Sequence, residues 1–138
     1  VKVPVIAAGG IADAKGVKEA LAQGADAVQI GTAYLCCPET ATSPLHRAAL
    51  TSTRQTALTT LFTGRPARGI MNRLMLELGH NNILAPEFPL ATAALAPLRS
   101  KAEAQGVDDF TPLWSGENRS GCRNIAADQL TRDLVADL

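Results

Sequence analysis

Two glycine turns, each directly after a short apolar run, constrain this chain more than any other feature. The first turn is Gly9 and Gly10 after residues 3–8, and the second is Gly31 after residues 27–30. Each run is short and apolar, as expected of a parallel strand buried on both faces. The two runs and the helical pattern between them fit in about 30 residues, the size of a minimal βαβ unit. The spacing therefore predicts two neighbouring parallel strands.

Glycines at the ends of such strands let an anion approach the backbone amides, because no side chain covers them. Asp13 can cap the helix that follows Gly9 and Gly10, and the dipole of this helix also favours an anion. Gly31 and Thr32 add a second group of amides and a hydroxyl donor. One such turn commonly serves to reverse the chain, but two at this spacing match the phosphate site after the last two strands of a (β/α) barrel. We therefore predict phosphate binding.

Composition excludes several other classes of protein. The chain has 138 residues, enough for one domain, with 46% apolar residues, 19% charged residues and no formal net charge. Without a basic run, nucleic acid is not an expected partner. No apolar stretch reaches the roughly 20 residues of a membrane span, so no membrane partner is expected. The three cysteines, Cys36, Cys37 and Cys122, lack the spacing of a disulfide framework or zinc site, which favours a cytoplasmic location.

The chain changes character after its first forty residues. We expect residues 1–40 to form the last two βα units of a barrel, and residues 41–138 to form a helical and loop region of the same domain. Helices are expected over residues 44–53, 69–78, 96–106 and 126–137, a strand or an extended segment over 57–63 and a basic turn over 63–69. The expected helix at 96–106 starts late because Pro97 interrupts the pattern. The abrupt start inside a strand suggests the C-terminal part of a longer protein.

The histidines, arginines and cysteines of the sequence show no arrangement typical of a catalytic site. His46 and His80 lack a carboxylate placed to orient them, so structural roles are expected; Arg47 would disfavour protonation of His46, and His80 would cap a helix end. Arg65 and Arg68 lie in the basic turn, where solvated or structural roles are commoner than anion binding. The adjacent Cys36 and Cys37 are expected to pack in the interior, and Cys122 to be exposed. We therefore predict no catalytic residue and no metal ligand in this chain.

Several segments resemble one family in the same order along nearly the whole chain. They are AAGGIAD, GADAVQIGTAYL, CPE, HRAAL, FTGRPARGIMNRL, FPL and FTPLWSGEN. The set is similar to the C-terminal portion of nitronate monooxygenases, formerly called 2-nitropropane dioxygenases. The first two segments also occur in other flavin and phosphate barrels, whereas GRPARG and the tryptophan-bearing WSGEN are more specific.

The resemblance implies an FMN-dependent (β/α)8 TIM barrel that oxidises alkyl nitronates with O2 to a carbonyl compound and nitrite. It also implies the cofactor-binding residues. Gly10 matches the glycine that contacts the FMN phosphate, and Gly9 lies beside it. The second phosphate-binding segment corresponds to Gln29, Ile30, Gly31 and Thr32. The family's catalytic histidine has no counterpart in this chain, and Glu117 stands where many relatives have glutamine.

The expected fold class is thus an incomplete α/β barrel: its last two strands plus appended helices. As an isolated fragment the chain should be inactive and poorly stable, because it holds part of a flavin site and exposes a strand edge. One alternative is a fragment of another FMN barrel, such as a flavin-dependent enoyl-acyl carrier protein reductase. A second alternative is a non-catalytic truncated remnant.

Overall fold

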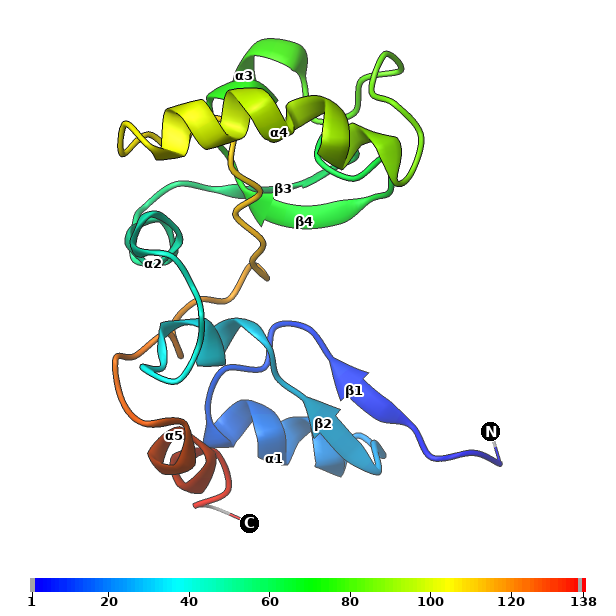
Figure 1. The fold of residues 1–138 in the computed structure, drawn as a ribbon. Helices are drawn as coiled ribbons and strands as arrows, with labels where there is room; N and C mark the ends of the chain where they lie inside the picture. Colours follow the sequence, from blue (N-terminus) through cyan, green and yellow to red (C-terminus); the bar gives the residue numbers. More distant parts are fainter. Residues whose placement is uncertain (1, 137) are drawn as a thin grey trace. The chain divides into compact units, whose positions relative to one another are not determined.

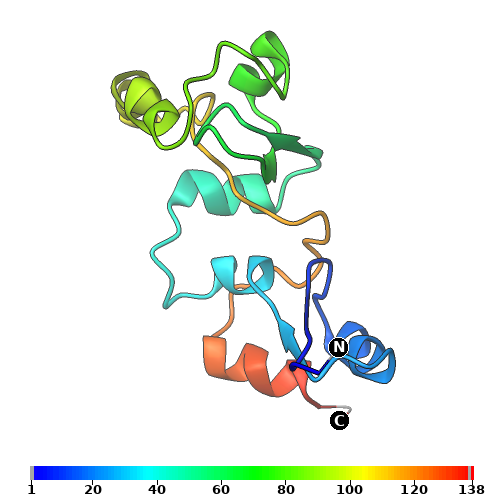
Figure 2. The ribbon, with the colours of Figure 1, turned by 90° about the vertical axis from the view of Figure 1, so that its right-hand side faces the viewer.

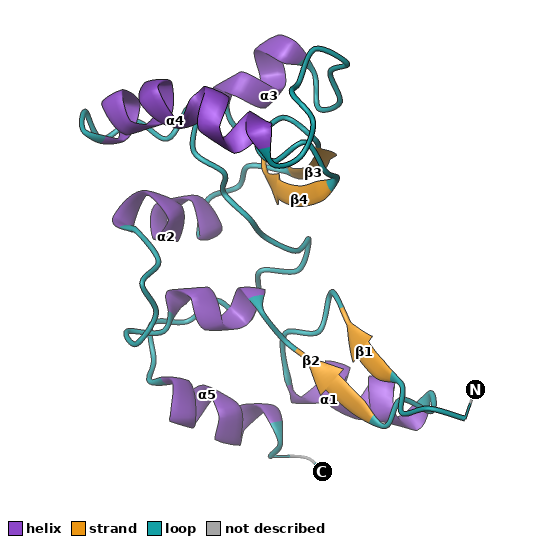
Figure 3. Ribbon diagram, turned by 45° about the vertical axis from the view of Figure 1, so that its right-hand side comes forward, coloured by secondary structure: helices purple, strands orange, loops and turns teal. Residues whose placement is uncertain are grey.

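The computed structural model describes residues 2–136 and 138, which fall into two compact units. Unit 1 comprises Val1–Thr42 and Gly116–Leu138, and unit 2 comprises Ser43–Ser115. Each unit contains one two-stranded sheet with helices packed beside it (Figures 1 and 3). No helix among the described residues is long and apolar enough to cross a membrane.

The sheet of unit 1 has the predicted parallel arrangement. Its strands are β1 (Ile6–Ala8) and β2 (Ala27–Gln29), paired in register from Ile6 with Ala27 to Ala8 with Gln29. The connecting helix α1 (Ala14–Ala22) begins at Asp13, whose carboxylate accepts a hydrogen bond from the Gly16 amide at 2.8 Å. The pattern of apolar runs and caps therefore predicted this βαβ unit correctly, although both strands are shorter than expected.

The prediction that both faces of these strands are buried is wrong for this chain. Val3, Val5 and Ile6 are 64%, 45% and 60% exposed. In β2, Val28 packs against the core of unit 1, while its neighbours in the strand are exposed. Successive side chains of a strand point to opposite faces. The helices of unit 1 thus cover one face of the sheet and leave apolar side chains of the other in solvent.

The core of unit 1 is built from residues near both ends of the chain. A 3₁₀ helix, η1 (Thr32–Cys36), follows the second turn, and α5 (Ala127–Leu134) is the last helix of the unit (Figure 2). The buried core residues are Val17, Ala33, Cys37, Leu130 and Leu134. Leu138, which follows this helix, is 66% exposed. Asp137, the expected last residue of this helix, lies outside the described residues.

Unit 2 contains a hairpin whose second strand the sequence pattern missed. Strands β3 (Thr56–Thr59) and β4 (Ala67–Ile70) pair antiparallel, and Gly69 also bridges to Trp114. The last three residues of the expected basic turn, 67–69, are therefore strand. The helix expected from residue 69 is α3 (Arg73–Leu78), which begins later because Asn72 is its N-cap. The sequence of β4 lacks an apolar alternation, so its pairing is decided by its partners.

Two further helices complete unit 2. The helix α2 (Pro44–Leu50) begins at the expected residue, with Ser43 as its N-cap, but ends earlier than expected. The helix α4 (Leu90–Glu103) continues through Pro97, so the predicted start near residue 96 is wrong. Its first turns are held by tertiary contacts: Ala91 is fully buried, and the Thr92 hydroxyl donates to the Phe62 carbonyl at 2.9 Å. These contacts offset the hydrogen bond that a proline removes.

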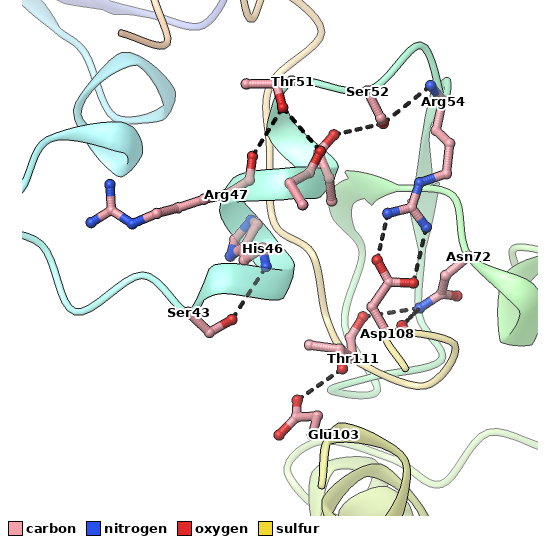
Figure 4. A network of polar contacts seen from close by, with 12 residues as sticks. Ser43, His46, Arg47, Thr51, Ser52, Arg54, Asn72, Glu103, Asp108 and Thr111 are labelled. Atoms are coloured by element: carbon pink, nitrogen blue, oxygen red, sulfur yellow. Dashed lines mark hydrogen bonds and ion pairs between the residues drawn. The ribbon is translucent and has the colours of Figure 1, made fainter. Parts of the chain in front are cut away.

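A polar network, partly buried, ties Arg54 and the N-cap of α3 to the segment around residues 108–111 (Figure 4). The Asn72 side chain donates to the carbonyls of Asp108 and Thr111, and the Met75 amide donates to its Oδ1. Arg54 forms two hydrogen bonds to the Asp108 carboxylate, at 3.1 and 2.5 Å. These contacts satisfy the polar groups that the loop places inside the unit.

Candidate functional site

The two glycine turns leave the sheet of unit 1 at the same end. Since Ala8 pairs with Gln29, the turn after β1 and the turn after β2 begin side by side. Gly9 and Gly10 have φ values of 96° and 74°, a conformation that favours glycine. The structure thus brings the predicted residues of both turns to one edge, as expected for the carboxyl ends of parallel strands.

The second turn differs from the first in its backbone. Gly31 has a φ of −115°, which any residue can adopt. A Cβ atom on Gly31, as on Gly9 and Gly10, would meet no atom within 4 Å. The space in front of both turns is therefore open. Ile30 packs its side chain into the core of unit 1, so it can offer a ligand its backbone alone.

A third segment, which the sequence reasoning did not single out as part of the site, contacts both turns. We call it the 116–122 loop. The Gly116 amide donates to the Thr32 hydroxyl oxygen at 2.9 Å, and the Asn118 side chain donates to the Gly10 carbonyl at 2.8 Å. The Cys122 thiol donates to the Thr32 carbonyl at 3.3 Å. These contacts span 84 to 108 residues of sequence, so no local pattern reveals them.

One hollow of unit 1 includes the first turn but not the second. It measures about 480 Å³ and lies along β1 and α1, with Gly9 and Gly10 at one end. Its lining combines exposed strand residues with Glu19 of α1 and with Gln23, the C-cap of that helix. A phosphate held by both turns would need residues 30–32 as well. We therefore interpret this hollow as the uncovered side of β1 and not as the phosphate site.

Cys122 is half-buried, and the expectation that it is exposed is wrong. Burial, together with the neighbouring Cys36, raises the pKa of the Cys122 thiol to about 12. Cys122 is therefore a neutral hydrogen-bond donor at physiological pH and not a thiolate nucleophile. Cys36 and Cys37 are buried, as predicted, and the three cysteines form no disulfide. Among the described residues, no group of three His, Cys, Asp or Glu side chains is placed to hold a metal ion.

The remaining candidate side chains lie in unit 2 and have structural contacts. His46 Nε2 lies 2.9 Å from the Trp114 carbonyl, and desolvation lowers its pKa, a different cause from the Arg47 charge we expected. Arg65 stacks over the Phe88 ring at 4.2 Å, and Arg68 donates to the Thr56 hydroxyl at 3.2 Å. Both arginines thus have contacts within unit 2. His80 is exposed, and its carbonyl accepts from the Thr60 amide.

Comparison with known proteins decides the family. The family model described as nitronate monooxygenase matches residues 1–137 of this chain. The chain belongs to the nitronate monooxygenase family. It is 40% identical to the nitronate monooxygenase of Pseudomonas aeruginosa over 138 residues, which are 98% of this chain and 39% of that protein. A probable nitronate monooxygenase of Bacillus subtilis is also 40% identical, over 98% of this chain and 40% of the relative.

Solved structures agree with this nitronate monooxygenase assignment. A nitroalkane oxidase from Streptomyces ansochromogenes matches with a TM-score of 0.90 and 39% identity, covering all of this chain and 40% of that one. FabK from Thermotoga maritima matches with a TM-score of 0.73 and 29% identity, covering 99% of this chain and 44% of its own. The chain therefore spans about 40% of the length of the curated relatives it matches. It is a mixed α/β segment of an enzyme family.

Proposed function

We propose that this chain is the C-terminal part of an FMN-dependent nitronate monooxygenase, and that its two glycine turns hold the FMN phosphate. The family match over residues 1–137 and the nitronate monooxygenase names of the curated relatives support this activity. In this proposal β1 and β2 are the last two strands of a (β/α)8 barrel. The parallel order, and the turns at the carboxyl ends of both strands, agree with that placement.

The main support for phosphate binding comes from Gly31. Gly9 and Gly10 have positive φ values, so the turn alone explains why they are glycines. Gly31 has no such constraint, and a Cβ there would contact nothing else in the chain. A ligand that approaches the backbone closely is a physical reason for a missing side chain. The open space at Gly31, beside the hydroxyl of Thr32, therefore fits a phosphate group.

The residues of this chain would bind and orient the cofactor. Amides of the two turns, from Gly10 to Ile11 and from Gly31 to Thr32, would donate to phosphate oxygens, and the helix that begins at Asp13 would favour the negative charge. FMN, when bound, supplies the electron-accepting chemistry that nitronate oxidation requires. Because this chain holds no candidate base, the chemistry at the nitronate would depend on other parts of the protein. We accordingly propose that the 138 residues alone are inactive and that the complete enzyme works in the cytoplasm.

The test uses a full-length chimera, in which these 138 residues replace the matching part of the Pseudomonas aeruginosa relative. Dissociation constants for FMN and riboflavin are measured in the chimera and in its Gly31→Ala variant. Riboflavin lacks the phosphate, so contacts to the flavin ring cancel in the ratio of the two constants. We expect Gly31→Ala to weaken FMN binding about tenfold or more, which corresponds to about 1.4 kcal/mol. Riboflavin binding and melting temperature should change little.

Equal affinity of the unsubstituted chimera for FMN and riboflavin would contradict phosphate binding by the two turns. Activity is tested separately, by oxygen uptake with propyl nitronate. The enoyl reductase alternative predicts instead the consumption of NAD(P)H with an enoyl thioester. The curated names and the higher TM-score of the nitroalkane oxidase favour nitronate oxidation. If the chimera binds FMN and shows neither activity, the non-catalytic alternative is supported.

A further inference from the structure

The 116–122 loop holds the two turns from one side. Gly116 donates to the hydroxyl oxygen of Thr32, and Asn118 donates to the carbonyl of Gly10, with donor–acceptor distances of 2.9 and 2.8 Å. The loop also packs closely on the segment after the first turn, since a Cβ on Gly121 would collide with the Ala12 carbonyl. The loop is therefore a direct connection between the two turns, in addition to the pairing of β1 with β2.

Hydrogen bonds within the loop fix the orientation of the Asn118 side chain. Its Oδ1 accepts from the amide and from the hydroxyl of Ser120, at 3.1 and 2.8 Å. A backbone amide can only donate and a carbonyl oxygen can only accept. The Oδ1 must therefore face Ser120, and the Nδ2 must face Gly10. The assignment of the two amide atoms follows from their partners.

The hydrogen bond from Asn118 to the Gly10 carbonyl also sets the direction of the Ile11 N–H. The Gly10 carbonyl and the Ile11 N–H belong to one planar trans peptide, so they point in opposite directions. A hydrogen bond that holds the carbonyl toward the loop aims the Ile11 N–H away from it. Without that bond, the two positive-φ glycines before Ile11 leave this peptide freer to rotate.

The same arrangement occurs at the second turn. Cys122 donates to the Thr32 carbonyl at 3.3 Å, which orients the Ala33 N–H away from the thiol. Because the Thr32 hydroxyl oxygen accepts from Gly116, its hydrogen is left to be donated elsewhere. Both turns are thus contacted through their acceptor atoms, while their donors point away from those contacts.

We propose that Asn118 is a positioning residue for a phosphate monoester: it fixes the Gly10–Ile11 peptide so that the amides of the two turns converge on one group. This inference rests on the proposed binding of the FMN phosphate. Preset donors bind an anion more tightly than mobile ones, because less conformational entropy is lost on binding. Asn118 itself need not touch the phosphate.

The experiment measures the ratio of FMN to riboflavin affinity in the full-length chimera and two variants. Asn118→Ala removes the donor. Asn118→Asp keeps the shape and the bonds to Ser120 but places an acceptor against the Gly10 carbonyl. We expect the ratio to fall about tenfold in the first variant, the effect of losing one well-placed hydrogen bond, and further in the second. Riboflavin affinity should change less than about twofold. Asn124→Ala, which alters an exposed asparagine of the same region, is the control.

The outcomes separate this inference from the proposed function. A ratio near one in the unsubstituted chimera would mean that the turns do not bind phosphate at all. A high ratio that stays unchanged in both Asn118 variants would overturn the positioning role while leaving the phosphate site intact. If neither variant folds, Asn118 is a structural residue and the inference is wrong. A parallel loss of FMN and riboflavin affinity would also count against it.

Discussion

The two sheets of this protein differ in how well the chain covers their apolar side chains. In unit 2, Gly69 and Ile70 of β4 are buried, and the hairpin packs with a cluster that includes Phe62 and Trp114. The Phe62 and Trp114 rings meet edge to face, with centroids 5.7 Å apart. In unit 1, Ile6 of β1 is 60% exposed. An apolar run thus predicts a strand, but it does not predict which part of a protein buries it.

A matched pair of substitutions tests this difference, and it should have the largest effect. Ile70 is 1% exposed, so Ile70→Ala should lower the free energy of unfolding of this chain by about 3 kcal/mol, as expected for a buried isoleucine. Ile6→Ala should change it by less than about 0.5 kcal/mol. Urea denaturation followed by circular dichroism measures both values.

The same pair also tests the barrel proposal. If the complete barrel covers β1, Ile6→Ala in the full-length chimera should destabilise by about 2 kcal/mol or more. Equal losses of unfolding free energy for Ile6→Ala and Ile70→Ala in the 138-residue chain would contradict the difference in burial between the two sheets. A small loss for Ile6→Ala in the chimera would argue against the placement of β1 in a barrel.

Helix caps give a second comparison with a smaller expected effect. Asn72 is 2% exposed and bonds to two loop carbonyls as well as to α3, whereas the exposed Asp13 caps α1 alone. Asn72→Ala should cost about 2 kcal/mol, because it removes the cap and leaves buried carbonyls without a donor. Asp13→Ala should cost about 1 kcal/mol. Thermal and urea denaturation measure the two losses, and the exposed Asn81→Ala is the control.

The smallest expected effect is the contribution of His46 to the pH dependence of the stability of unit 2. Burial lowers the folded-state pKa of His46 below its ordinary value near 6.5, so the unfolded chain takes up a proton first. This contribution to stability is full above about pH 6.5 and is lost as the pH falls through the folded-state pKa. His46→Gln should therefore reduce the loss of stability between pH 7.5 and 5, by less than about 1 kcal/mol.

The exposed His80 supplies the matched control for this measurement. Urea midpoints of the unsubstituted chain, His46→Gln and His80→Gln are compared at the two pH values. An unchanged pH dependence in His46→Gln would show that other groups cause it. A change of the same size in His80→Gln would show that the effect does not depend on burial.

Sequence reasoning was most successful where local physics decides structure. The caps Asp13 and Ser43 begin their helices, and Gly79 ends α3 with a φ of 76°. It failed for β4, whose residues become a strand because β3 and the Leu113 and Trp114 backbone supply partners. It also failed at Pro97. The cost of a proline inside a helix would by itself shorten α4, but tertiary contacts of Ala91 and Thr92 hold its first turns in place.

The glycine turns show the same division for the candidate site. The spacing of Gly9, Gly10 and Gly31 by itself determined that two parallel strands would end in turns without side chains, because backbone conformation and strand period are local properties. The tertiary structure alone decided that the 116–122 loop returns to these turns and that Asn118 bonds to Gly10. Such a contact joins residues 108 positions apart. It depends on how the whole unit packs, and no local preference of either residue encodes it.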